Sequence, residues 1–382
     1  FQRLAYMDLA TRQLKFLADH INWDVESIEL SHDGQTLAFV TNEDGISVLH
    51  LLDTRTNKER PVTALPKGVI GGLEWRKNGK ELGLTLSSAR SATDVYSVSI
   101  DKMTVTRWTE SETGGLNTAT FSEPDLVRWK SFDGRSISGF LYRPPAKFTG
   151  KRPVIIQIHG GPESQFRPSF LGRNNYFINE LGIAVLFPNV RGSSGYGKTF
   201  LTLDNGYKRE DSVKDIGALL DWIERQPGLD SGRVMVTGVS YGGFMTYAVA
   251  EAYGSRLRCA FAASGISDFL TYFRNTDSAR VEDRRAEYGD ERIPEVRDFL
   301  ARISPAAGAS RLRIPLLIAH GQKDSRVPVD QAEAMAAAAR ANGVPVWLTI
   351  YTDEGHLLPT TRVNNDFLFY TWIRFVQEYL IK

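Results

Sequence analysis

The sequence predicts two parts, an all-β segment followed by an α/β domain with a doubly wound, mostly parallel sheet. Two observations predict this division. A repeated strand pattern fills the first 115 residues, and apolar runs alternate with helical patterns from about residue 120 onward. With 382 residues the chain also exceeds the usual size of one domain. We place the boundary so that residues 1–118 and residues 119–382 each form a core of their own.

The first part contains an internal repeat. Residues 28–37 (IELSHDGQTL) return 45 residues later as residues 73–82 (LEWRKNGKEL), and each copy holds an Asp-Gly or Asn-Gly turn between apolar alternations. An apolar strand that ends in aspartate recurs at Asp8, Asp53 and Asp101, at spacings of 45 and 48 residues. A period of this size built from short strands is typical of β-propeller blades, and an ordinary meander sheet is the alternative.

The propeller pattern is incomplete. Propellers need roughly four or more blades to close around their axis, whereas residues 1–118 show about two blades and a fragment that begins midway through a blade at Met7-Asp8. We therefore expect upstream blades in a longer polypeptide or in another chain. The unpaired edge of the fragment also favours association, so a homo-oligomer is a further expectation.

Composition excludes several classes of protein. The chain has 46 basic and 45 acidic residues and a net charge of +1, without long charged runs, so we expect no partner among nucleic acids or anionic membranes. No apolar stretch has the length that spans a bilayer. Hydrophobic residues make up 42%, which is typical of a folded globular protein. No leader pattern follows Phe1, so cytoplasmic and exported locations both stay open.

The second part alternates buried strands with helices. A hairpin around Asp133-Gly134 comes first, and continuous apolar runs follow, as expected for parallel strands covered on both faces. One run begins with the single cysteine, Cys259, which we interpret as a core residue. The predicted strands are 126–131, 137–142, 154–158, 184–187, 234–237, 259–263, 316–319 and 346–351, and the predicted helices are 212–225, 241–252, 329–341 and 365–380.

A G-x-S-x-G motif marks the junction between one strand and the next helix. The motif, Gly238-Val239-Ser240-Tyr241-Gly242, has the context of a nucleophile elbow, in which glycines relieve the crowding of a sharp turn and leave the serine hydroxyl exposed. It predicts an α/β-hydrolase domain with Ser240 as the nucleophile. A glycine-rich turn without catalytic duty is the alternative.

The order of the remaining residues indicates a base and its partner. In this fold an acidic residue and then a histidine follow the serine, and only His320 and His356 follow Ser240. His356 lies in a loop between the last strand and the last helix, so we predict that it is the general base. His320 ends a strand, and we expect it to pack or bond locally. Asp324 is predicted to orient His356, and the rival pair 353–354 lies too close to His356 in sequence.

A glycine-rich turn supplies the expected oxyanion hole. Residues 159–162 (HGGP) follow a predicted strand, as does the turn that provides one backbone donor beside the residue after the nucleophile. We assign the donors to Gly161 and Tyr241, with a tight structural turn as the alternative. No cofactor and no metal is predicted, because His159 and His320 lack the spacing of zinc ligands.

Together these motifs resemble the prolyl oligopeptidase family of serine peptidases, which carries a propeller over its active site. Within the family, the segment 324–328 (DSRVP) looks more like the acylaminoacyl-peptidase branch than the dipeptidyl-peptidase branch, which typically has Asn where Arg326 stands. Two features depart from the family pattern: LLP follows His356, and the acidic pair that binds a free amino terminus is not identifiable. The matching segments are 159–162, 189–197 (NVRGSSGYG), 238–243, 324–328 and 353–356.

The resemblance implies a substrate pocket and a substrate class. It implies that Arg326 lies beside a short peptide or acyl-peptide substrate. Arg191 and Val327, from two of the matching segments, are further pocket candidates. For Arg191 and for Arg326 alike, a salt bridge that fixes the loop is the alternative. Tyr272 and Phe273 are candidates for an apolar wall, with core packing as the alternative.

The resulting hypothesis is a serine peptidase of the oligopeptidase, acylaminoacyl-peptidase or aminopeptidase type, acting through an acyl-enzyme. A carboxylesterase that uses the same triad is the alternative, because fold does not fix substrate. A propeller-borne binding module with an idle hydrolase domain is a third class, and the complete set of catalytic parts disfavours it.

Overall fold

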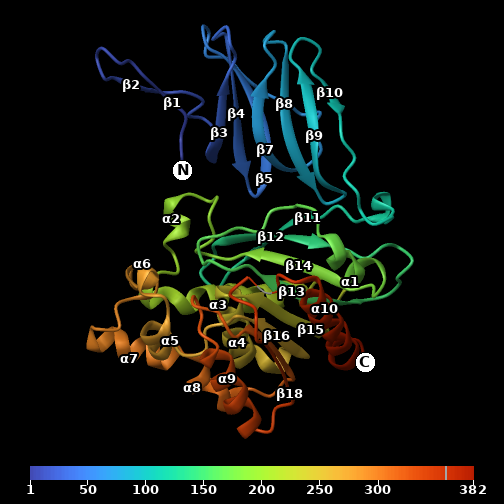
Figure 1. The fold of residues 1–382 in the computed structure, drawn as a ribbon, viewed down its shortest axis with the longest axis vertical. Coiled ribbons are helices and arrows are strands. Elements are labelled where there is room, and N and C mark those ends of the chain that lie inside the picture. Colours follow the sequence, from blue (N-terminus) through green and yellow to red (C-terminus); the bar gives the residue numbers. More distant parts are fainter. Residues whose placement is uncertain (358) are drawn as a thin grey trace. The chain divides into compact units, whose positions relative to one another are not determined.

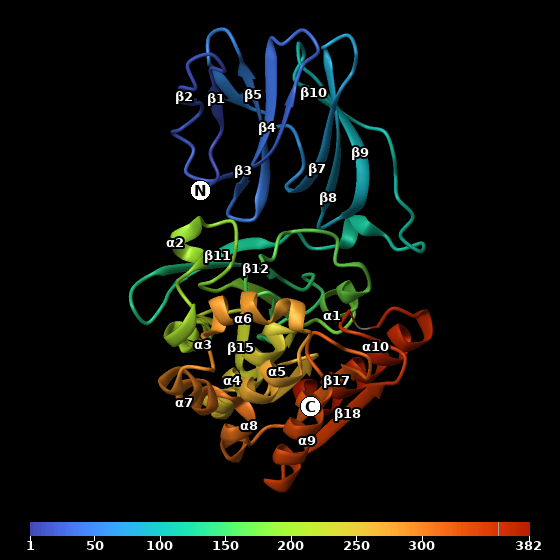
Figure 2. The same cartoon turned by 60° about the vertical axis from the view of Figure 1, so that its left-hand side comes forward.

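The computed structural model describes residues 1–357 and 359–382. The chain forms two compact units (Figure 1, Figure 2). The first unit comprises Phe1–Asp125, Gln165–Glu180 and Ser194–Leu201, and the second comprises Leu126–Ser164, Leu181–Ser193 and Thr202–Lys382. Two segments from the later part of the sequence therefore belong to the first unit, an arrangement that a single boundary after residue 118 does not describe.

The first unit is built from antiparallel strands that pair with their neighbours in sequence. This arrangement confirms the predicted all-β segment of propeller-like blades. The first sheet contains β3 (Asp24–Leu30), β4 (Thr36–Glu43), β5 (Ile46–Asp53) and β6 (Glu59–Pro61), and the second contains β7 (Gly68–Trp75), β8 (Glu81–Ser88), β9 (Ser91–Ser99) and β10 (Thr104–Arg107). A separate hairpin joins β1 (Ala5–Met7) to β2 (Leu14–Phe16).

The sequence repeat corresponds to repeated turn chemistry. Gly34 and Gly79 lie 45 residues apart and have φ values of 68° and 65°, in the left-handed region that favours glycine. The side chain before each glycine, Asp33 or Asn78, accepts a hydrogen bond from the N–H two residues further on. The two β-hairpins β3–β4 and β7–β8 therefore turn in the same way.

A second repeated turn relates the β1–β2 hairpin to β5–β6. Asp8 and Asp53 each accept hydrogen bonds from the N–H groups two and three residues ahead. Each turn then has one left-handed residue, Arg12 with φ 57° and Asn57 with φ 54°. The β1–β2 hairpin thus has the form of the last two strands of a blade, as the recurrence of aspartate indicates.

Polar contacts join the segment Gln165–Glu180 of the first unit to its sheets. Asn42 on β4 donates to Gln165 at 2.7 Å, and Arg167 forms an ion pair with Glu26 at 2.8 Å. These contacts bridge more than a hundred residues of chain, and they explain why the segment Gln165–Glu180, which includes α1 (Asn175–Asn179), groups with the strands. The second inserted segment contains α2 (Lys198–Leu201).

The second unit is built on one eight-stranded sheet. Its strand order is β11-β12-β14-β13-β15-β16-β17-β18. Strand β12 pairs antiparallel with β14, and β14, β13, β15, β16, β17 and β18 pair in parallel along the rest of the sheet. The strands are β11 (Asp125–Lys130), β12 (Ser136–Tyr142), β13 (Arg152–Ile158), β14 (Ala184–Asn189), β15 (Leu229–Val239), β16 (Cys259–Ala263), β17 (Leu316–Gly321) and β18 (Val346–Tyr351).

Helices connect the parallel strands, and the predicted α/β class is confirmed. Strands β14, β16 and β17 are buried along their whole length, as expected where both faces of a parallel sheet are covered. The helices are α3 (Arg209–Glu224), α4 (Tyr241–Tyr253), α5 (Phe269–Asn275), α6 (Val281–Tyr288), α7 (Pro294–Ile303), α8 (Pro305–Gly308), α9 (Asp330–Ala341) and α10 (Arg362–Val376). Within residues 1–357 and 359–382, every helix is too short or too polar to cross a membrane.

Candidate active site

The turn between β15 and α4 holds Ser240 in a strained conformation. Ser240 has φ 60° and ψ −119°, a region that residues with a side chain rarely adopt. The adjacent glycines make this turn possible. A Cβ atom on Gly238 would lie 2.4 Å from the backbone of Gly242, and one on Gly242 would lie 2.3 Å from the carbonyl oxygen of Ile158. The local structure is that of the nucleophile elbow which the sequence motif predicts.

The structure brings Ser240, His356 and Asp324 into one hydrogen-bonded series. His356 Nε2 lies 3.0 Å from Ser240 Oγ, and His356 Nδ1 lies 2.7 Å from Asp324 Oδ2. The other carboxylate oxygen, Asp324 Oδ1, accepts the backbone N–H groups of Arg326 and Val327 at 2.9 Å each. Both oxygens of Asp324 are thereby fixed, and the carboxylate in turn fixes the ring of His356.

Asp324 stays ionised although it is buried. Burial acts to raise its pKa, but the neighbouring ring of His320, the hydrogen bond from His356 and the N–H of Val327 outweigh burial and hold the pKa of Asp324 well below its usual range. His320 is itself fully buried, and its Nε2 atom bonds the carbonyl oxygen of Val327 at 2.7 Å. This local role agrees with the expectation that His320 is not the base.

The two other candidate carboxylates, Glu354 and Asp353, interact with residues other than His356. Glu354 accepts hydrogen bonds from Thr360, Asn364 and the backbone of Thr361, and the bonds from Thr360 and Asn364 lower its pKa to about 2. Asp353 is exposed and pairs with Lys323 at 3.2 Å. Of the three acidic side chains considered from the sequence, Asp324 is the one that meets His356.

The HGGP turn packs directly against the elbow. A Cβ atom on Gly160 would lie 3.1 Å from the carbonyl oxygen of Val239 and 3.5 Å from Ser240 Cβ. Gly161 has φ 127°, a conformation that residues with a side chain rarely adopt. Tyr241 is the first residue of α4, where backbone N–H groups lack partners within the helix. Gly161 also lines the same cavity as Ser240, and Tyr241 directly follows Ser240 in sequence, so both residues predicted to supply oxyanion donors lie next to the nucleophile.

A cavity of about 350 Å³ opens at Ser240. Three of its residues, Glu163, Arg280 and Arg284, were missed by sequence reasoning. The one available signal was that Arg280 and Arg284 are four residues apart, which places them on one face of a helix. The lining residues are Gly160, Gly161, Glu163, Val239, Ser240, Arg280, Arg284, Arg326, His356 and Leu357.

Of the predicted pocket side chains, Arg326 lines this cavity and the apolar ones do not. Val327 is buried, and its backbone serves Asp324 and His320. Tyr272 and Phe273 are buried on α5 and contact each other and Tyr288 through their rings. The core-packing alternative accounts for both aromatic residues better than a role as the wall of this cavity.

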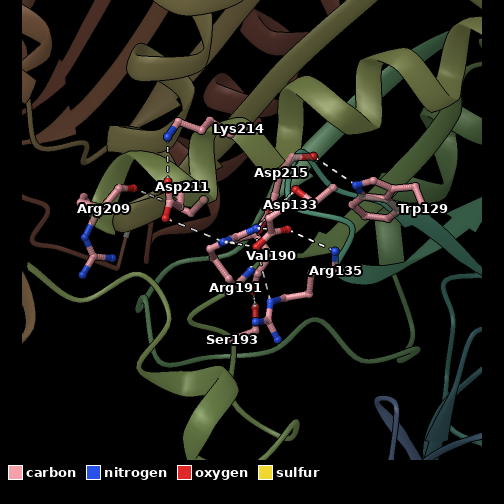
Figure 3. A network of polar contacts seen from close by, with 12 residues as sticks. Trp129, Asp133, Arg135, Val190, Arg191, Ser193, Arg209, Asp211, Lys214 and Asp215 are labelled. Atoms are coloured by element: carbon pink, nitrogen blue, oxygen red, sulfur yellow. Dashed lines mark hydrogen bonds and ion pairs between the residues drawn. The ribbon is translucent and has the colours of Figure 1, made fainter. Parts of the chain in front are cut away.

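Arg191 is held away from the cavity by carboxylates. Its side chain is 3% exposed, and its guanidinium bonds Asp215 at 2.8 and 3.0 Å and Asp133 at 3.2 Å (Figure 3). Asp133 belongs to the hairpin turn before β12, and Asp215 belongs to α3. Arg191 therefore connects its loop to the turn before β12 and to α3. This arrangement corresponds to the salt bridge that was the alternative to substrate contact.

A second buried arginine supports the elbow from behind. Arg209 is fully buried, forms ion pairs with Asp204 and Glu287, and lies 5.3 Å from the ring centre of Tyr241. The hydroxyl of Tyr241 bonds Asp204 at 3.0 Å and Ser212 at 2.9 Å. The side chain of the predicted oxyanion residue is thus anchored in a charged cluster, which no sequence motif indicated.

Comparisons with known proteins agree with this geometry. The model of the prolyl oligopeptidase family matches residues 168–382, more than half of the chain. An uncharacterized peptidase, YuxL, of Bacillus subtilis (strain 168) is 32% identical over 247 residues, which are 63% of this chain and 36% of that protein. A dipeptidyl-peptidase 5 of Porphyromonas endodontalis is 26% identical over 88% of this chain and 49% of its own length. The chain thus spans half or less of the length of these curated relatives.

Solved structures show the same fold. The acylaminoacyl peptidase of Pyrococcus horikoshii superposes with a TM-score of 0.80 at 23% identity, over 97% of this chain and 58% of that one. The two structures therefore share all-β sheets followed by a mostly parallel α/β sheet, over part of the length of the Pyrococcus horikoshii protein. The family match, the elbow and the complete Ser-His-Asp series agree, and the chain belongs to the prolyl oligopeptidase family of serine peptidases.

Proposed function

We propose that this protein hydrolyses short peptides or acyl-peptides with Ser240 as nucleophile, His356 as general base and Asp324 as the group that orients the base. The observation that carries the proposal is the hydrogen-bonded series from Asp324 through His356 to Ser240 at a strained turn. Membership of a peptidase family supports peptides as the substrate class.

In the proposed reaction His356 Nε2 removes the proton of Ser240 Oγ while that oxygen attacks the scissile carbonyl carbon. The negative charge that forms on the carbonyl oxygen is stabilised by the N–H groups of Gly161 and Tyr241. His356 then gives the proton to the leaving nitrogen, and the C–N bond breaks to leave an acyl-enzyme. Water attacks this ester with the same help from His356, which releases the acid product and restores Ser240.

Asp324 supports each of these steps through its charge. Its low pKa keeps the carboxylate ionised at neutral pH, so it stabilises the imidazolium form of His356 that exists between proton transfers. Its hydrogen bond to His356 Nδ1 also leaves Nε2 free to accept the proton of Ser240. Replacement of Asp324 by Asn is expected to reduce kcat by about four orders of magnitude.

The cavity and the relatives support a proposal about which end of the peptide is cleaved. Arg326 lines the cavity beside Ser240, as the resemblance to acylaminoacyl peptidases implies. A solved structure with the same fold is an acylaminoacyl peptidase, and a curated relative is a dipeptidyl-peptidase. We therefore propose that the protein removes residues from the amino-terminal end of short peptides, with an acylated end favoured.

A matched substrate panel tests the proposal. An acyl-peptide, the corresponding free peptide and a short-chain ester are compared by kcat/KM, and a fluorophosphonate probe reports the reactive serine. We expect hydrolysis of the acyl-peptide and labelling at Ser240, both lost in Ser240→Ala with the fold retained by circular dichroism. Hydrolysis of the ester alone would identify a carboxylesterase instead. Activity of Ser240→Ala within about tenfold of the parent protein would refute the nucleophile.

A further inference from the structure

The cavity at Ser240 carries an excess of positive charge. Three arginines and one glutamate line it, so these side chains contribute a net charge of +2 at neutral pH. Glu163 pairs with Arg284 at 3.4 Å, and Arg284 also donates to the carbonyl oxygen of Gly161 at 3.2 Å. Glu163 and Arg284 therefore largely neutralise each other.

Arg280 and Arg326 remain as uncompensated charges. Across residues 1–357 and 359–382, no acidic side chain forms an ion pair with either guanidinium. Arg280 is only partly exposed, so part of its hydration is already lost. A cation in this setting interacts more strongly with an incoming anion than a cation on an open surface does.

The two segments that carry these arginines are bonded to each other. The backbone N–H of Asp277 donates to the carbonyl oxygen of Ser325 at 2.9 Å, and Thr276 Oγ1 donates to the carbonyl oxygen of Arg326 at 2.7 Å. Asp277 also caps the turn that ends at Arg280, accepting from the backbone N–H of Ala279 at 3.0 Å. The backbone on which both arginines stand is thus fixed before a ligand arrives.

We propose that Arg280, together with Arg326, forms a carboxylate site, so that the enzyme favours substrates with a carboxylate near the scissile bond. The forked guanidinium group matches a carboxylate with two parallel hydrogen bonds. The carboxylate belongs either to an acidic side chain next to the scissile bond or to the free carboxyl terminus of a very short peptide. This inference rests on the proposed peptidase function and narrows its substrate class.

Three pairs of acyl-peptides test the site. The first pair differs by glutamate or glutamine on the acyl side of the scissile bond, and the second by the same exchange on the leaving side. The third pair differs by a free or an amidated carboxyl terminus. We expect the carboxylate member of one pair to have a kcat/KM at least about tenfold higher. The pair that shows the preference identifies the source of the carboxylate.

Arg280→Gln and a matched control assign the preference to a residue. Arg280→Gln should lower the ratio of kcat/KM values for the preferred pair several-fold, with Arg326 as the remaining cation of the site. Arg274→Gln removes the same charge from an exposed position on α5 that does not line the cavity, and it should leave the ratio unchanged. Arg280→Lys keeps the charge without the fork, and it should retain only part of the preference.

A salt titration of the parent protein gives a test that needs no variant. The ratio of kcat/KM values should fall as ionic strength rises from about 0.01 to about 0.5 M, because salt screens the attraction between charges. Equal rates on both members of all three pairs, or equal ratios in Arg280→Gln and Arg274→Gln, would overturn the carboxylate site. In that result hydrolysis of the acyl-peptides, together with fluorophosphonate labelling at Ser240, would still uphold the peptidase proposal. Absence of labelling and of hydrolysis would overturn both.

Discussion

His320 and His356 meet the same oxygen of Asp324. Oδ2 of Asp324 lies 2.7 Å from His356 Nδ1 and 3.5 Å from His320 Nε2. His356 is the histidine that also reaches Ser240, whereas the Nε2 atom of His320 bonds the carbonyl oxygen of Val327. The two rings therefore have different duties around one carboxylate.

Replacement of His320 by Leu should affect stability more than chemistry. The change leaves the carbonyl oxygen of Val327 without its partner in a buried site, which is expected to cost about 1–3 kcal/mol in the free energy of unfolding. We expect kcat/KM to fall by no more than about tenfold, compared with a loss of several orders of magnitude in His356→Ala. Urea unfolding and steady-state kinetics of both variants measure the difference. Equal kinetic losses would mean that His320 takes part in proton transfer.

Variants of Arg326 and Arg191 test which of these two arginines contacts the substrate. Arg326→Ala should lower kcat/KM for peptides more than for simple esters, because only a peptide offers further carbonyl or carboxylate groups to a long forked side chain. Arg191→Ala should instead reduce stability, since it leaves Asp215 buried without its ion-pair partner. The kcat/KM of Arg191→Ala should fall by the same factor for peptides and for esters. A selective loss on peptides in Arg191→Ala would contradict the structural role.

Removal of the charge of Arg209 should strongly destabilise the second unit. Arg209→Met leaves Asp204 and Glu287 in a buried site without their cation, and breaking such a pair is expected to cost about 3–5 kcal/mol. Because Asp204 also holds the hydroxyl of Tyr241, kcat should fall as well. The pair Arg209→Met and Tyr241→Phe separates the two effects, since Tyr241→Phe removes the hydroxyl and leaves the ion pairs. Wild-type stability of Arg209→Met would show that the cluster contributes little.

Glu354 makes the stability of the His356 loop depend on pH. Hydrogen bonds from Thr360 and Asn364 lower the pKa of Glu354 to about 2, below its value of about 4.3 in an unfolded chain. A lowered pKa stabilises the folded state above the unfolded pKa, and this contribution is lost as the pH falls toward 2. Glu354→Gln should therefore lower Tm at pH 7, and the difference from the parent protein should shrink below about pH 4. A difference that is constant from pH 7 to pH 3 would contradict this role.

The sequence alone predicts the nucleophile elbow, Asp324 and His356, because their positions follow from the order of strands in the sheet. Parallel strands place their carboxyl ends at one edge, so Ser240 after β15, Asp324 after β17 and His356 after β18 were expected to meet. Turn chemistry at Gly34 and Gly79 likewise predicted hairpins from local residues alone.

The remaining parts depend on contacts that no local pattern encodes. Arg280 and Arg284 reach the cavity only because the segment between β16 and β17 is bonded to the loop after β17, at Ser325 and Arg326. For Arg191 the sequence left two roles open, because an arginine suits a carboxylate of the protein as well as one of a substrate. The burial of Asp215 beside it decides between them, and burial is a tertiary property.

The division of the first unit among three stretches of chain also bears on how the protein is made. Its last stretch ends at Leu201, so its contacts cannot all form until the ribosome has released that residue. By then β11, β12, β13 and β14 of the other unit have already been synthesised, although their neighbour β15 has not. The first unit therefore cannot finish folding before part of the second has been synthesised, and it depends on contacts between residues far apart in the sequence, a condition that slows folding.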